Sequence, residues 1–158
     1  MGFCLLEDAE REDVLFAVNS AHVVDLKEQK GGGAVFCDLE FSRPLVRGDQ
    51  RIDLRAKGTE DDIWTLLRKS AKIGLDKAKL NLMAKLSANP MPLLINQPGR
   101  IMAVYELMPE DFMAENKSVF TASALFFEDG SIRFISERPA RFVYQTNAGH
   151  VMPTLKME

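Results

Sequence analysis

Arginine side chains fall into two groups that could contact phosphate or carboxylate groups. The first group is spaced by four residues across a turn and a strand: Arg43, Arg47, Arg51 and Arg55. Even spacing along a strand places Arg51 and Arg55 on one face. The second group alternates with aromatic residues: Arg133, Phe134, Arg138, Arg141, Phe142 and Tyr144. Arginine beside exposed aromatic rings can bind single-stranded nucleic acid by phosphate contact and base stacking. We favour the alternative in which Phe134 and Phe142 are core residues and therefore not open to bases.

Carboxylates supply a second candidate chemistry. Asp38 and Glu40 share one face of a predicted strand, and their spacing of about 7 Å suits a metal ion or a coupled pair of carboxyl groups. Acids that alternate on a solvated strand are common, so the pattern favours a solvent-exposed face. Glu106 is the better single candidate for a carboxyl with a shifted pKa, because Met102 and Val104 precede it on the same strand face.

Histidine and cysteine are scarce and widely separated. A Ser–His–Asp or Cys–His arrangement needs a nucleophile and an orienting acid beside His22 or His150, and the sequence places neither Ser20 nor Cys4 there. We therefore interpret the histidines as structural or surface residues. Cys4 and Cys37 lack the spacing of metal ligands and are predicted to be free thiols. The sequence predicts no cofactor, no metal site and no catalytic residue.

The triple glycine Gly31-Gly32-Gly33 resembles a phosphate-binding loop in composition only. Such a loop is followed by a helix, whereas residues 34–41 alternate as a strand. The context predicts a hairpin turn instead.

Composition indicates one ordinary globular domain over residues 1–158, with a net charge of −3. No apolar run approaches the roughly 20 residues of a membrane-spanning helix, and the acidic start does not match a signal peptide. We expect a cytoplasmic protein that does not insert into membranes.

One long central helix is predicted over about residues 59–87, because Thr59 can cap it and acidic residues follow at its start. Its apolar stripe has small residues in the middle, at Ser70, Ala71 and Gly74, where another backbone could pack closely. Leu80 and Met83 lie on the opposite side of this helix, so another segment covers them or they form a contact surface.

Short extended segments surround the helix. Strand character is favoured over helix for residues 13–27, and strands are also predicted at 34–41, 51–57, 100–108, 118–127, 132–136 and 140–145. Residues 1–12 are predicted to form an irregular arm and 146–158 an irregular tail. The predicted fold is α+β, with a curved, mainly antiparallel sheet of about 6–8 strands packed on the central helix.

Three functions follow, in order of preference. The first is a non-catalytic protein-interaction module (an adaptor, an inhibitor, or an assembly or chaperone-like factor) that binds a protein partner or itself, with Leu80 and Met83 as its surface. The second is a nucleic-acid-binding sheet that uses Arg51, Arg55, Arg133, Arg138 and Arg141. The third is a small-molecule pocket between helix and sheet, lined by Trp64, Met102 and Glu106.

Overall fold

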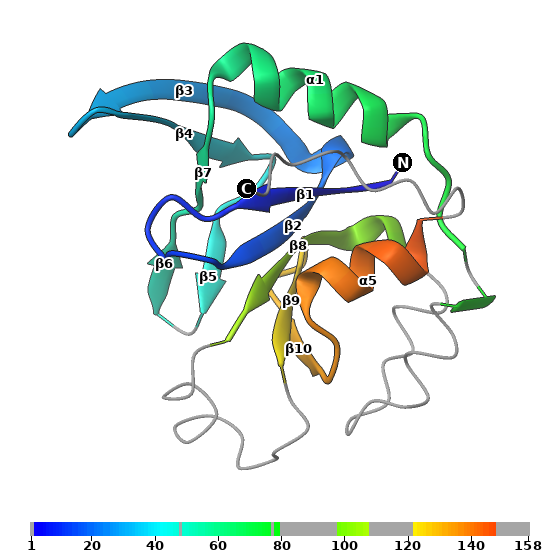
Figure 1. The fold of residues 1–158 in the computed structure, drawn as a ribbon. Helices are drawn as coiled ribbons and strands as arrows, with labels where there is room; N and C mark the ends of the chain where they lie inside the picture. The colour runs from blue at the N-terminus through cyan, green and yellow to red at the C-terminus, as the bar shows by residue number, and fades with distance from the viewer. Residues whose placement is uncertain (1, 48, 77, 80–97, 108–121, 148–158) are drawn as a thin grey trace.

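The computed structural model describes residues 2–47, 49–76, 78–79, 98–107 and 122–147. Its largest element is an antiparallel sheet in the order β1-β2-β8-β9-β10 (Figure 1). The strands of this sheet are β1 Phe3–Glu7, β2 Leu15–Asn19, β8 Ile101–Glu106, β9 Ser123–Phe127 and β10 Ile132–Ile135. Each strand of this sheet pairs antiparallel with its neighbour, as predicted. The predicted α+β class is confirmed.

A second, three-stranded sheet has the order β3-β4-β7, and a two-stranded hairpin, β5-β6, lies beside it. The bounds are β3 Val23–Gly31, β4 Ala34–Phe41, β5 Leu45–Arg47, β6 Gln50–Ile52 and β7 Arg55–Lys57. An isolated bridge between Asp8 and Ala56 joins the end of β1 to β7. The prediction of one continuous sheet is therefore wrong: the described strands form three sheets.

Helix α1, Glu60–Ala71, begins as the sequence predicts. The Thr59 hydroxyl accepts a hydrogen bond from the Asp62 amide, and the Glu28 carboxylate accepts one from the Glu60 amide. The helix ends at Lys72, and Leu75 then forms a bridge with Asn147, so the predicted continuous helix to residue 87 is wrong. The 12-residue helix is long enough to bury Ile63 and Leu67 on one face. It ends shortly before Gly74, a residue that is unfavourable inside a helix.

The segment predicted as an irregular arm contains a buried strand, β1. Phe3, Cys4, Leu5 and Leu6 are each at most 2% exposed, because β1 is covered on both faces. A strand buried on both sides carries a continuous apolar run, which lacks the alternation that identifies half-buried strands. The backbone of Gly2 lies against the end of α1, where its amide donates to the Ser70 carbonyl at 2.9 Å.

Residues predicted to be extended after Arg138 form helix α5, Pro139–Thr146. Proline at the first turn suits a helix start, since its nitrogen has no hydrogen to leave unpaired. Phe142, Val143 and Thr146 are buried on one side of α5, which is the spacing of a helical face. Thr146, assigned to the irregular tail by the sequence, is thus the last residue of a helix, and residues 148–158 lie outside the described part.

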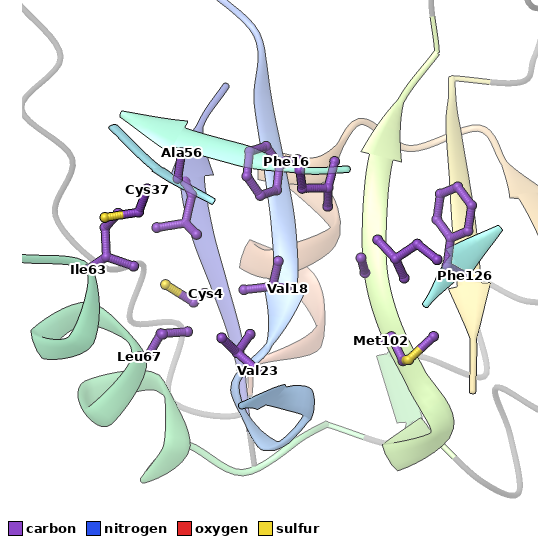
Figure 2. Packing of buried hydrophobic residues seen from close by; sticks show 14 of the residues in the cluster. Cys4, Phe16, Val18, Val23, Cys37, Ala56, Ile63, Leu67, Met102 and Phe126 are labelled. Carbon is purple, nitrogen blue, oxygen red and sulfur yellow. The ribbon is translucent and has the colours of Figure 1, made fainter. Parts of the chain in front are cut away.

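Two apolar clusters occupy the two faces of the five-stranded sheet. The first lies between this sheet, α1 and the β3-β4-β7 sheet; Figure 2 shows Ile63 and Leu67 of α1 pointing toward Cys4, Cys37 and Val23. The second is covered by α5 and includes Phe3, Phe127 and Phe142. Helix α5 thus covers the face of the sheet opposite α1 (Figure 1).

Glycines with positive φ form two hairpin turns, the first of which was predicted at the triple glycine. Gly32 and Gly33 both have positive φ (58° and 80°), which is the geometry of a primed two-residue turn between β3 and β4. Gly130 has φ 89° in the turn between β9 and β10. In residues 13–27 the strand interpretation is confirmed by β2 and β3, with the short 3₁₀ helix η1, Ser20–His22, between them. Within the described residues, no helix has the length and apolar character to cross a bilayer.

Candidate functional site: the groove beside strand β4

A polar groove runs along the end of β4, between this strand and the β5-β6 hairpin. It consists of two neighbouring cavities of about 250 and 350 Å³ that share Leu39, Glu40, Arg51 and Asp53 in their linings. The last paired residue of β7 is Arg55, opposite Asp38, and only the bond from the Leu39 amide to the Leu54 carbonyl continues the ladder. Beyond Leu54 the β5-β6 hairpin separates from β4, and the groove is the space between them.

At one end of the groove, a row of charged side chains crosses the three-stranded sheet. Lys27, Asp38 and Arg55 are direct cross-strand neighbours, so they share the sheet face that points away from Cys37 and α1. The Arg55 Nε atom lies 2.6 Å from the Asp38 Oδ1 atom, and its Nη1 atom lies 3.4 Å from Glu10. The Arg55 guanidinium also lies 5.5 Å from the centre of the Phe36 ring. These contacts hold Arg55 in one orientation.

The other predicted arginine of this group is more accessible. Arg51 lies on β6 and forms an ion pair of 3.3 Å with Asp53, and both side chains are about two-thirds or more exposed, at 68% and 73%. An ion pair this exposed contributes little to stability. Arg51 is therefore available to a ligand. The prediction of one strand over residues 51–57 is wrong, because Arg51 lies on β6 and Arg55 on β7, in different sheets. Both side chains nevertheless line the smaller cavity.

At the opposite end, Ser42 lines the larger cavity and contacts a buried histidine behind it. The Ser42 Oγ atom lies 2.9 Å from Nδ1 of His22, which is 8% exposed. The other ring nitrogen, Nε2, lies 2.7 Å from the Gly99 carbonyl in the 3₁₀ helix η2, Pro98–Arg100. A Glu128 oxygen lies 3.9 Å from the same nitrogen.

The sequence did not reveal this pair. His22 was considered only with Ser20 and Cys4, and the Ser20 hydroxyl instead contacts the Gly2 carbonyl at 3.4 Å. Ser42 follows β4, and the antiparallel pairing of β3 with β4 brings it back to His22, with the Ser42 amide donating to the His22 carbonyl. Strand pairing alone was not a sufficient signal, because equal distances from the Gly32-Gly33 turn place Arg43, not Ser42, opposite His22. The register shift between Val23 and Asp25 moves the pairing by one residue and brings Ser42 to His22.

Residues of the predicted helix–sheet pocket do not line this groove. Met102 is 2% exposed in the first apolar cluster, and Trp64 packs against the same cluster. The Glu106 carbonyl accepts a hydrogen bond of 2.8 Å from Arg11, whose guanidinium lies 4.2 Å from the centre of the Tyr105 ring. Arg11 also pairs with the buried Asp8 at 3.1 Å, so this cluster fastens the 8–14 turn to β8.

The second arginine group does not form the predicted stacking surface. Phe142 is fully buried and Phe134 packs against the first cluster, so neither ring is open to a base, as the core interpretation expected. Arg141 pairs with Glu137 at 3.5 Å, Arg138 precedes α5, and Arg133 contacts the Ile132 carbonyl. Leu80 and Met83, the predicted interaction surface, lie outside the described residues. In the described part of the chain, no cluster of His, Cys, Asp and Glu is placed to hold a metal ion.

Both cysteines are buried free thiols, as predicted. Burial raises the pKa of Cys4 from 9.0 to about 12, against a smaller opposing effect of its hydrogen bond with Ser70. Burial, and then the nearby carboxylates of Glu28, Glu60 and Asp38, raise the pKa of Cys37 to about 11. Neither thiol is a nucleophile near neutral pH, because the thiolate is the reactive form.

We expect iodoacetamide at about pH 8 to leave both thiols unmodified in the folded protein and to alkylate both in urea. Because folding raises the pKa of both thiols above 9.0, the folded state favours their protonated form. The stability that the two buried, neutral thiols contribute is complete below about pH 9 and is lost as pH rises toward 11–12. Mass spectrometry of the alkylated protein and urea unfolding curves at increasing pH test both points. Rapid alkylation of the native protein would contradict the burial of the thiols.

Comparison of the chain with protein-family models, curated proteins and solved structures finds no significant match.

Proposed function

We propose that this protein is an interaction module that binds an extended segment of a partner protein in the groove beside β4. The observation that carries the proposal is the mixed charge of the groove lining. Four basic and three acidic side chains surround the two cavities: Lys27, Arg43, Arg51, Arg55, Asp38, Glu40 and Asp53. A nearly balanced lining complements a polypeptide with charges of both signs better than it complements a polyanion.

The apolar part of the lining supports the same occupant. Leu39, Leu45 and Leu54 are buried or half-buried along the groove, and Phe41 and Ile52 lie beside them. An extended peptide presents side chains alternately, so one set can contact this apolar floor while its neighbours meet the charged walls. We infer a partner segment with an apolar residue flanked by one acidic and one basic residue.

A displayed random-peptide library, selected on the immobilised protein, tests this function. We expect enriched peptides of that pattern, and we expect Arg51→Glu to weaken binding of a synthetic copy about tenfold or more, through loss of a charge-assisted contact. Arg68→Glu is the matched control, because Arg68 is also an exposed arginine but lies on α1. Arg51 is exposed and forms only a surface ion pair, so the variant should keep the stability of the wild type.

Two results would overturn the proposal. One is a selection that enriches no sequence pattern, or enriches peptides whose affinity is equal for wild type and Arg51→Glu. The other is binding of a labelled single-stranded oligonucleotide that falls steeply with salt and depends on Arg51, which would assign the groove to nucleic acid instead.

A further inference from the structure

We propose that Ser42 and His22 form a nucleophile–base pair that hydrolyses carboxylic esters bound in the larger cavity of the groove. The pair combines the two positions that such chemistry needs. Ser42 is exposed and lines the cavity, whereas His22 is buried directly behind it with 2.9 Å between Oγ and Nδ1. This distance is within the hydrogen-bond range of an activated serine.

The contact of the second ring nitrogen, Nε2, determines which nitrogen of the His22 imidazole carries the hydrogen. A backbone carbonyl can only accept a hydrogen bond, so the Gly99 carbonyl, 2.7 Å from Nε2, requires that Nε2 carry the hydrogen. In the neutral ring Nδ1 then has a free lone pair, and the Ser42 hydroxyl donates to it. His22 can then act as a general base toward serine through Nδ1, with the roles of the two ring nitrogens exchanged relative to the Ser–His–Asp triad, where Nε2 is the base and Nδ1 carries the hydrogen.

Glu128 completes the arrangement on the far side of the ring. Its Oε2 atom lies 3.9 Å from the His22 Nε2 atom, and its Oε1 atom lies 3.3 Å from Arg100. A carboxylate at this position stabilises the imidazolium that forms when His22 accepts a proton. The Asn19 amide also binds the Gly99 and Ile101 carbonyls, at 3.3 and 3.0 Å, so η2 is held in place next to the histidine.

The reaction has two balanced halves. In the first, the Ser42 Oγ atom forms a bond to the ester carbonyl carbon while His22 Nδ1 takes the hydroxyl proton; the bond to the leaving alcohol then breaks, and Nδ1 returns the proton to that alcohol. In the second, water attacks the acyl-serine, Nδ1 takes a proton from the water and returns it to Ser42, and the carboxylic acid leaves. The net change is ester plus water to acid plus alcohol.

The lining of the cavity indicates the class of ester. Phe41, Pro44 and Ile52 offer apolar contacts for a short acyl chain. Arg43 and Arg51 line the same cavity beside Glu40 and Asp53, and Arg51 pairs with Asp53. Positive charge near the carbonyl oxygen stabilises the negative charge that develops there in the transition state. Esters of short apolar acids are therefore the expected substrates.

The direct test uses p-nitrophenyl butyrate as substrate and a fluorophosphonate as a covalent probe of the full chain. We expect hydrolysis above the buffer rate, one fluorophosphonate adduct that peptide mass spectrometry places on Ser42, and loss of the rate by about 100-fold or more in Ser42→Ala. This variant removes the contact of Ser42 with His22 but no buried volume, since Ser42 is exposed, and circular dichroism checks that it remains folded. Ser20→Ala is the matched control, because Ser20 lies in the same 3₁₀ turn as His22 but contacts the Gly2 carbonyl.

The adduct experiment needs no variant, so a folding defect cannot hide the answer. A Ser42 adduct with a rate that depends on Ser42 supports the pair as catalytic. An unlabelled wild-type protein without measurable hydrolysis overturns the proposal, and so does an adduct on another residue; the contacts of His22 would then serve only to fasten η1 to β4 and η2.

Discussion

Replacing Phe142 by Ala is expected to lower the free energy of unfolding by about 3–5 kcal/mol. Phe142 is fully buried under α5, and its ring packs edge to face on Phe3 with 4.9 Å between ring centres and 74° between planes. The substitution removes this aromatic contact and leaves a cavity between α5 and the five-stranded sheet, because the flanking strands cannot close over it.

Urea unfolding followed by circular dichroism measures the loss. Tyr144→Ala is the matched control: it removes an aromatic ring from the same helix, but Tyr144 is 51% exposed, so we expect a change within about 0.5 kcal/mol. If the two variants lose equal stability, α5 does not cover the second apolar cluster as the structure has it.

The second large effect is expected at Asn147, whose side chain pairs with β1 like a neighbouring strand. The Phe3 amide donates to Oδ1 at 3.0 Å, and Nδ2 donates to the Phe3 carbonyl at 3.1 Å; Asn147 is fully buried. Asn147→Ala leaves two buried backbone groups without these partners, which we expect to cost about 2–4 kcal/mol.

The isosteric variant Asn147→Asp separates hydrogen bonding from packing. At neutral pH its carboxylate meets the Phe3 carbonyl, two acceptors face each other, and stability falls. The same burial raises the carboxyl pKa in the folded variant, so the lost stability returns as pH falls and the acid regains a hydrogen to donate. Urea unfolding over a pH series measures this recovery, with wild type as reference. Equal deficits at low and neutral pH would contradict the paired geometry.

Local signals in the sequence were sufficient for much of the fold. The hydroxyl of Thr59 with its following acids defines the start of α1, and Gly32-Gly33 and Asp129-Gly130 define two hairpins. Each of these features depends on residues a few positions apart, where backbone preference and capping act directly. The spacing of Arg51 and Arg55 predicted one face of a single strand, whereas the chain passes from β6 to β7 between them, and they meet only because both strands border the same cavity.

What the sequence could not show depends on distant residues. Residues 140–145 were predicted as a strand, but they form helix α5, in which Phe142 and Val143 pack together on the apolar face of the distant five-stranded sheet. The run Phe3–Leu6 lacks alternation because α1 and α5 cover opposite sides of β1. Ser42 approaches His22 through the β3–β4 pairing, and Gly99 reaches the same ring from 77 residues away.

The attachment of Asn147 to Phe3 also bears on how the molecule folds. These two residues are 144 positions apart, so β1 can pair with Asn147 only after α5 has been synthesised. Closing so long a loop costs entropy before any contact offsets it, which makes folding slow relative to helical proteins of this size. Until then the apolar run of β1 stays uncovered on the α5 side, and nascent or truncated chains that lack α5 are the species most exposed to aggregation.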